Sequence, residues 1–113
     1  MHDVQDEEDF RRLVLESPEP TVVLFWATWC PFCRKVKPEF DRLGARLPAR
    51  FACVYLDDES NPLWVDYAVD VVPTLALFRN GDLVDRENGI LGYGLDARMI
   101  QDFVDRVTPL LSR

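Results

Sequence analysis

Cys30 and Cys33 are the residues of this sequence best suited to chemistry, because they stand three positions apart in the segment Trp29-Cys30-Pro31-Phe32-Cys33. A buried strand is predicted to end shortly before Cys30, and a helix is predicted to begin at Pro31. Residues three apart on a helix share a face, at a Cα separation that a disulfide accepts. The pair can therefore interconvert between dithiol and disulfide with little movement of the backbone.

The two sulfurs are predicted to have different roles because their positions differ. Cys30 would occupy the N-cap, where unpaired backbone N–H groups and the positive end of the helix dipole favour the thiolate. Cys30 is therefore predicted to be the nucleophile. Cys33, inside the first turn, is better shielded and fits the resolving thiol that attacks a mixed disulfide. The cations Arg34, Lys35 and Lys37 could help to ionise Cys30, but solvated surface charges are the simpler interpretation.

A structural metal site is the alternative interpretation of the cysteine pair. A tetrahedral zinc site needs about four ligands, and beyond the pair the chain offers only Cys53 and His2. Cys53 lies in the middle of a predicted strand, where a cysteine is typically a small buried apolar residue. We therefore predict that the chain binds no metal.

Composition restricts the classes of partner. The 113 residues, of which 48% are apolar, are predicted to form a single domain over residues 1–113. A net charge of −7 repels phosphate backbones and anionic lipid, so neither nucleic acid nor a membrane is an expected partner. Five acids between positions 3 and 9 stand where a signal peptide would have cations and an apolar stretch. We expect a monomer in the cytoplasm, with a secreted protein that has lost its signal peptide as the alternative.

Hydrophobic periodicity predicts alternating helices and strands. Helices are expected over 6–15 and 31–47, after Asn61-Pro62, and after a capping Asp96; strands are expected over 21–26, 51–56, 74–78 and 83–85, with at most a stub of strand before the first helix. Asn80-Gly81 is the strongest hairpin signal, so the last two strands should be antiparallel. This order predicts an α/β domain with a mixed sheet of four to five strands, parallel at its centre, hairpin-closed at one edge and flanked by helices on both faces.

Four motifs stand in a fixed order along the chain: the WATWCPFC box, Pro38 in the following helix, Val72-Pro73-Thr74 at the start of a strand, and Phe78-Arg79-Asn80-Gly81. In this ordered set the chain resembles the thioredoxin family over nearly its whole length. The resemblance implies the thioredoxin fold, exchange of protein disulfides, and no metal or organic cofactor. It also implies that Pro73 is a cis proline facing the active site, that the Val72 backbone pairs with an extended substrate, and that Trp29 flanks the substrate groove.

The dipeptide between the cysteines departs from the family. It is Pro31-Phe32, where thioredoxins usually have Gly-Pro, and it is similar to the Pro-Tyr of glutaredoxins. With Pro31 in the first place, the N–H of Phe32 is free to point at the Cys30 sulfur. We expect this additional donor to stabilise the thiolate and the reduced form, which would make the protein a stronger oxidant than a Gly-Pro relative. The Phe32 side chain is expected to contact partner proteins.

Two further departures concern a buried ion pair and a loop. Thioredoxins place a buried acid where this chain has Leu24 and a lysine where it has Tyr55. Because the acid helps to deprotonate the resolving cysteine, its loss leaves that step without an identified base.

The loop over residues 89–94 is longer than usual in the family and should border the substrate groove. It is expected to be flexible, and either altered partner choice or a loop without function would account for it.

Together these features predict a protein dithiol–disulfide oxidoreductase in which Cys30 attacks the target disulfide and Cys33 releases the reduced product. Electrons would come from a thioredoxin reductase or from glutathione. A glutaredoxin-like, glutathione-dependent reductase is the alternative enzyme. A peptide-binding module of the chaperone kind, in which the cysteines contribute little, is the alternative outside the enzymes.

Overall fold

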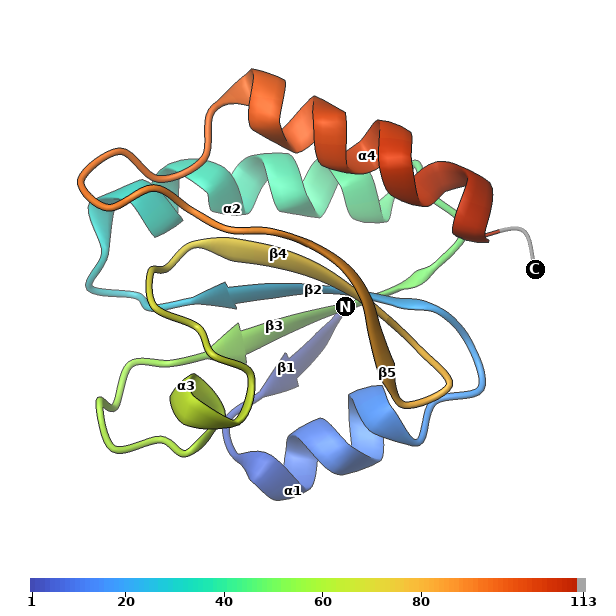
Figure 1. Ribbon diagram of the computed structural model, residues 1–113, viewed down its shortest axis with the longest axis horizontal. Helices are drawn as coiled ribbons and strands as arrows, with labels where there is room; N and C mark the ends of the chain where they lie inside the picture. The colour runs from blue at the N-terminus through green and yellow to red at the C-terminus, as the bar shows by residue number, and fades with distance from the viewer. Residues whose placement is uncertain (112–113) are drawn as a thin grey trace.

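The computed structural model describes residues 1–111, which form a mixed sheet between two layers of helices (Figure 1). Helices α2 and α4 cover one face of the sheet, and α1 and α3 lie on the other side. The elements are β1 (His2–Val4), α1 (Glu7–Phe10), the π-helical segment η1 (Arg11–Leu15), β2 (Thr21–Trp26), α2 (Pro31–Gly44), β3 (Arg50–Tyr55), α3 (Leu63–Asp66), β4 (Thr74–Arg79), β5 (Asp82–Glu87) and α4 (Ala97–Leu111). None of these helices has both the length and the apolar character needed to span a membrane.

The five strands are arranged in the order β1-β3-β2-β4-β5. β1 and β2 pair with β3 in parallel, whereas β4 is antiparallel to β2 and β5 is antiparallel to β4. The prediction of a parallel centre therefore holds only for β1, β3 and β2. A parallel crossover needs a dozen or more residues that carry the chain back along the sheet, usually in a helix. The four residues of α3 are too few, so β4 starts at the end of the sheet where β3 stops.

The first helix and the hairpin follow their local sequence signals. Asp6 caps α1 by accepting the Asp9 N–H at 2.8 Å, and the helix continues to Leu15, although its second half is π-helical rather than α-helical. Asn80 and Gly81 both have positive φ, at 54° and 82°. This conformation at both central positions is the one that a tight two-residue hairpin requires, and the predicted antiparallel pair is confirmed.

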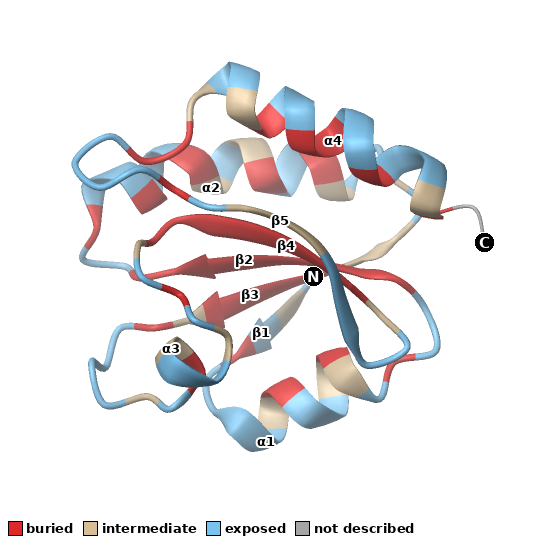
Figure 2. Ribbon diagram, viewed as in Figure 1, coloured by how far each residue is buried: buried red, intermediate tan, exposed pale blue. Residues whose placement is uncertain are grey.

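The core lies on both faces of the central strand (Figure 2). Every residue of β2 is buried, as expected for an apolar strand covered on two sides. Below the sheet an aromatic cluster packs Phe10 against Tyr67 and Phe78, with ring centroids 4.8 and 5.2 Å apart. Above it the inner faces of α2 and α4 are buried, and α4 points Ile100, Phe103, Val104 and Val107 inward as the periodicity predicted.

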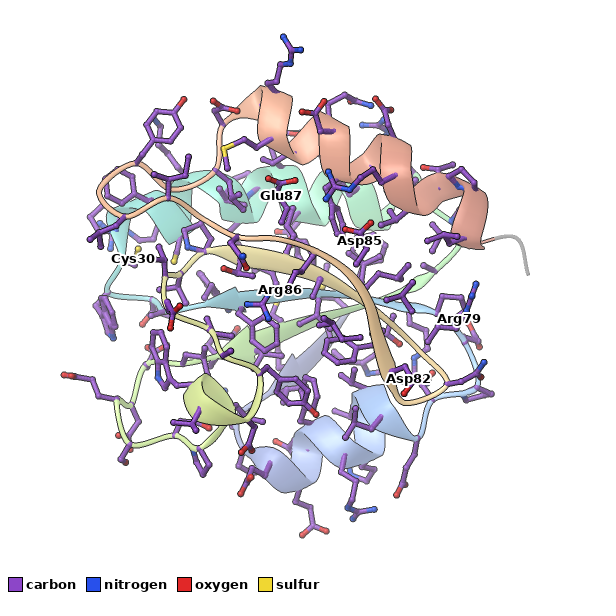
Figure 3. All side chains as sticks on the ribbon, in the orientation of Figure 1. Cys30, Arg79, Asp82, Asp85, Arg86 and Glu87 are labelled. Carbon is purple, nitrogen blue, oxygen red and sulfur yellow. The ribbon has the colours of Figure 1, made fainter. Side chains whose placement is uncertain are left out.

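Side-chain bonds fix the edge strand β5 to its neighbours. Arg86 donates from Nη1 to the Tyr67 carbonyl oxygen at 2.6 Å, and Arg106 of α4 reaches Asp85 and Glu87, each at 3.0 Å. Figure 3 labels Asp85, Arg86 and Glu87 along this strand. The chain leaves β5 for the loop before α4, so these contacts set where that loop begins.

Candidate active site

Cys30 lies where the loop after β2 meets the start of α2 (Figure 3). It is the N-cap residue, with extended backbone angles of φ −92° and ψ 116°, and Pro31 is the first residue of the helix. Cys30 and Cys33 are both free thiols. Cys30 keeps 6% of its surface exposed and Cys33 has none. The helix start therefore leaves Cys30 as the less buried of the two cysteines and places Cys33 behind it, in agreement with the prediction that Cys33 is better shielded.

The Cys30 thiol is directed at the segment before β4. Its Sγ donates to the Val72 carbonyl oxygen at 3.7 Å, and the Val72–Pro73 peptide bond is cis, as the resemblance implied. Within residues 1–111, no helix N–H caps the Cys30 side chain. A neutral thiol is a weak acceptor, so donation to a carbonyl is the favourable arrangement for this protonation state. The expected hydrogen bond from the Phe32 N–H to the Cys30 sulfur applies to the ionised form of Cys30, and it stays a prediction.

Cys33 has a strongly perturbed environment. Burial raises the pKa of the Cys33 thiol well above its ordinary value, and the neighbouring Cys30 and Asp57 raise it further, while the Ala27 backbone N–H opposes them. At neutral pH the Cys33 thiol of the reduced protein therefore keeps its proton. This suits a thiol that reacts only after Cys30 has formed a bond to another sulfur.

Asp57, directly after β3 and Leu56, is a site residue that the sequence analysis missed. Its carboxylate accepts the Thr28 backbone N–H at 3.1 Å and the Thr28 hydroxyl, and its backbone carbonyl accepts the Trp29 indole N–H at 3.0 Å. Asp57 thus holds the loop that presents Cys30, and it is the carboxylate whose charge acts on Cys33. Asp57 could have been found from the predicted topology, because neighbouring parallel strands bring their carboxyl ends to one edge of the sheet.

No ion pair occupies the place of the family's buried acid among the described residues. Leu24 is fully buried opposite Cys53 of β3. Tyr55 packs on Trp26, with ring centroids 5.1 Å apart, and donates its hydroxyl to Asp3 at 3.3 Å. Apolar packing therefore replaces the charged pair.

The third cysteine lies inside the sheet. Cys53 is fully buried, and burial raises its pKa to about 11, against the opposing charge of Lys37. It is therefore a neutral thiol at physiological pH, in agreement with its interpretation as a small apolar residue. Across residues 1–111, no group of three or more His, Cys, Asp and Glu side chains is arranged to hold a metal ion.

The predicted substrate-contacting residues gather around Cys30. Trp29 is 55% exposed and Phe32 is 36% exposed, and Pro31 is exposed between the cysteines. Val72 and Pro73 are buried, but the bond to Cys30 places the Val72 carbonyl beside the sulfur.

The cations that follow the cysteine pair have partners of their own. Arg34 donates to the Thr28 carbonyl oxygen at 3.0 Å, and Lys37 pairs with Asp41 at 2.8 Å. These two contacts favour the interpretation of Arg34 and Lys37 as structural or solvated charges.

Comparison with known proteins agrees with this geometry. Residues 2–104 match the thioredoxin family. The chain belongs to the thioredoxin family. The dithiol–disulfide oxidoreductases of this family use a Cys-x-x-Cys pair, and Cys30 and Cys33 form that pair here. The sheet and its flanking helices are the thioredoxin fold.

Individual relatives support the same assignment. The chain is 36% identical over 88 residues to the mitochondrial thioredoxin of Mus musculus. The aligned residues make up 77% of this chain and 53% of that protein. It is 32% identical over 85 residues to the thioredoxin of Rickettsia felis, covering 74% of this chain and 81% of that one. The chain thus spans about half the length of the mitochondrial relative. The X-ray structure of Fasciola hepatica thioredoxin superposes with a TM-score of 0.76 at 27% identity, over 94% of this chain and 98% of that chain.

Proposed function

We propose that this chain is a protein dithiol–disulfide oxidoreductase that works through Cys30 and Cys33. The Cys30 thiolate attacks one sulfur of a substrate disulfide, forming a mixed disulfide, and the first substrate thiolate leaves and takes a proton. Cys33 then gives up its proton and attacks the Cys30 sulfur. The second substrate thiolate leaves and is protonated. The substrate has gained two electrons and two protons, and the chain holds a Cys30–Cys33 disulfide.

The observation that carries this proposal is the asymmetry of the two thiols. Cys30 lies at a helix N-cap and keeps part of its surface exposed, whereas Cys33 is fully buried one turn behind it. The bond from Cys30 to the Val72 carbonyl adds a docking point. Once Cys30 is bonded to a substrate sulfur it has no S–H proton, so the Val72 carbonyl becomes free to accept a substrate backbone N–H beside Pro73. Trp29, Pro31 and Phe32 would contact the flanks of the same segment.

The electron source distinguishes the proposal from its alternatives. We expect insulin disulfides to be reduced when a thioredoxin reductase and NADPH regenerate the dithiol. Turnover with glutathione alone, together with activity on glutathionylated proteins, would instead identify the glutaredoxin-like enzyme that Pro31-Phe32 suggests. If neither donor supports insulin reduction, the oxidoreductase proposal is wrong and the peptide-binding module is favoured.

We further propose a monomer working in the cytoplasm, with neither nucleic acid nor a membrane as partner, and without a metal or organic cofactor.

The direction of electron flow is set by the redox potential of the pair relative to that of the compartment. We propose that Pro31 leaves the Phe32 N–H available to the Cys30 thiolate, which stabilises the reduced form and makes the protein more oxidising. Exchanging the order with Pro31→Gly and Phe32→Pro removes that N–H. One lost charge-assisted bond of about 1.4 kcal/mol corresponds to a potential about 30 mV more negative. Equilibration with glutathione redox buffers measures the change, and an unchanged or higher potential in the variant would contradict the proposal.

A further inference from the structure

An open pocket of about 370 Å³, called the indole pocket below, is lined by Trp29, Glu59 and Trp64. Trp29 directly precedes Cys30 in the chain. Glu59 lies in the segment between β3 and α3, and Trp64 belongs to α3. Among residues 1–111, the lining holds two indole rings and one carboxylate and no basic side chain. Two aromatic rings and a negative charge therefore meet beside the cysteine site.

Both indole rings of the pocket are held by the backbone of one loop. The Trp29 Nε1–H donates to the Asp57 carbonyl oxygen at 3.0 Å, and the Trp64 Nε1–H donates to the Asp58 carbonyl oxygen at 3.2 Å. The Asp58 carboxylate in turn accepts the Ser60 N–H at 2.9 Å and the Ser60 hydroxyl at 2.7 Å. Because both indole N–H groups already have acceptors, a ligand can contact these rings only through their faces and carbon edges.

The carboxylates of this loop give the indole pocket a negative potential. Asp57, Asp58 and Glu59 are consecutive, and all three are exposed. Hydrogen bonds from Ser60 hold the pKa of Asp58 below its ordinary value, so this carboxylate is ionised at neutral pH. The carboxylates of Asp57 and Asp58 already accept hydrogen bonds from the protein. Glu59 makes no ion pair within the described part of the chain, so its carboxylate is the one available to a ligand.

The combination of indole rings and a carboxylate favours a cationic ligand. A cation over the face of a tryptophan ring is attracted by the quadrupole of the ring. A planar guanidinium can stack on an aromatic ring and also donate two hydrogen bonds to a carboxylate. An anionic group would be repelled by Glu59 and its two acidic neighbours. An apolar side chain would remove the Glu59 carboxylate from water without pairing it.

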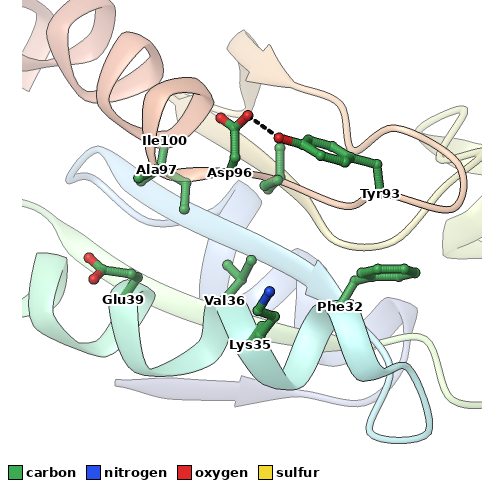
Figure 4. A pocket seen from close by; sticks show the side chains of 9 residues that line it. Phe32, Lys35, Val36, Glu39, Tyr93, Asp96, Ala97 and Ile100 are labelled. Atoms are coloured by element: carbon green, nitrogen blue, oxygen red, sulfur yellow. Dashed lines mark hydrogen bonds between the residues drawn. The ribbon is translucent and has the colours of Figure 1, made fainter.

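The pocket between α2 and α4 has a different character (Figure 4). Its lining includes the Lys35 ammonium, the carboxylates of Glu39 and Asp96, and the rings of Phe32 and Tyr93. It lies on the face of the sheet that α2 and α4 cover, whereas α3 lies on the other side. Tryptophan binds a cation more strongly than phenylalanine or tyrosine. Of the two pockets, the indole pocket is therefore the better match for a cationic side chain.

We propose that the indole pocket binds an arginine side chain of the polypeptide substrate that is joined to Cys30. The guanidinium lies against the indole rings and pairs with the Glu59 carboxylate. Because Trp29 directly precedes Cys30, the arginine is placed within a few residues of the substrate cysteine. The inference rests on the proposed function and adds a substrate preference to it.

Two matched sets of peptide disulfides test the proposal. Each is a symmetric disulfide of a pentapeptide with a central cysteine, and arginine occupies each of the four other positions in turn, with alanine elsewhere. In the second set citrulline, which has a similar shape and no charge, replaces arginine. The salt concentration is about 0.15 M, so that charges more than about 8 Å apart are largely screened.

Each reduced protein is mixed in single turnover with one disulfide and quenched by alkylation, and the protein thiols that remain are counted by mass spectrometry. At the position that reaches the indole pocket, we expect the arginine peptide to oxidise the wild type about fivefold faster than the citrulline peptide. This ratio is equivalent to about 1 kcal/mol.

Glu59→Gln and Trp64→Leu should each lower this ratio to less than about two. Glu19→Gln is the matched control, because Glu19 is exposed and precedes β2, at the opposite end of that strand from Cys30. Its replacement removes the same charge away from the pocket and should leave the ratio at the wild-type value. Trp64 also packs against the core, so Glu59→Gln decides the outcome if Trp64→Leu does not fold.

The citrulline peptides separate failure of this inference from failure of the proposed function. Equal rates for the two sets in the wild type would remove the arginine site and leave the oxidoreductase intact. An unchanged ratio in Glu59→Gln would also overturn the inference. An equal fall in Glu59→Gln and Glu19→Gln would do the same, because it would reflect net charge alone. A wild-type protein that neither set oxidises would contradict the proposed function and this inference with it.

Discussion

Replacing Cys33 by serine is expected to convert the protein from a catalyst into a covalent trap for its substrates. Cys30 can still attack a disulfide, but the serine hydroxyl cannot displace the bound product. Multiple-turnover reduction of insulin should fall by about a thousandfold, as it does when a residue of a concerted catalytic group is removed. Non-reducing electrophoresis and mass spectrometry should then show a disulfide between Cys30 and the substrate.

The other two cysteines supply the controls. Cys30→Ser should form no complex, because the accessible nucleophile is lost. Cys53→Ala should turn over like the wild type, because Cys53 is a buried residue of the sheet. Since burial raises the pKa of Cys33, release of substrate in the wild type should accelerate as the pH rises above neutral and more Cys33 ionises. Complexes trapped through a residue other than Cys30, or wild-type turnover by Cys33→Ser, would contradict the assigned roles.

Replacing Leu24 by aspartate is expected to destabilise the protein strongly, although it introduces the acid that thioredoxins have at this position. Leu24 is fully buried, and Tyr55 offers no cation in the place of the family's lysine. Lost apolar packing and an unpaired buried charge together should lower the free energy of unfolding by about 4 kcal/mol at neutral pH. Chemical denaturation of the variant and the wild type at a series of pH values measures the loss.

The pH dependence of this loss identifies its cause. Burial raises a carboxyl pKa above its value of about 4 in the unfolded chain. The loss of unfolding free energy in Leu24→Asp should therefore be smallest below the unfolded-state pKa. It should grow as the pH rises through the folded-state pKa. Leu24→Asn, which has a similar size and no charge, should show a deficit independent of pH. Parallel pH profiles for the two variants would show that lost packing, and not charge, is responsible.

Features set by neighbouring residues were predictable from the sequence. The apolar run of β2, the Asn80-Gly81 turn and the Asp96 cap each act within a few residues, and all three form as expected. The place of Cys30 at the start of a helix belongs to the same class, because Pro31 suits the first helical position and ends the preceding loop.

Features that depend on long-range packing were predicted wrongly or missed. β4 runs antiparallel to β2 because the short α3 does not carry the chain back along the sheet. Asp57 lies just beyond a predicted strand, and its bond to Thr28 depends on the pairing of β2 with β3, which brings the ends of the two strands together. The sequence did not show that the 89–94 loop approaches Phe32 and Pro73 so closely that a Cβ at Gly94 or Gly89 would collide with them.

By itself, the sequence determined that two cysteines share the first turn of a helix after a buried strand, since spacing and local propensity act through adjacent residues. Only the tertiary structure decided what surrounds those sulfurs. The Val72 carbonyl, the Asp57 carboxylate and the loop over residues 89–94 come from segments far apart in the chain. Burial and contact between such segments arise from packing across the sheet, which local pattern does not specify.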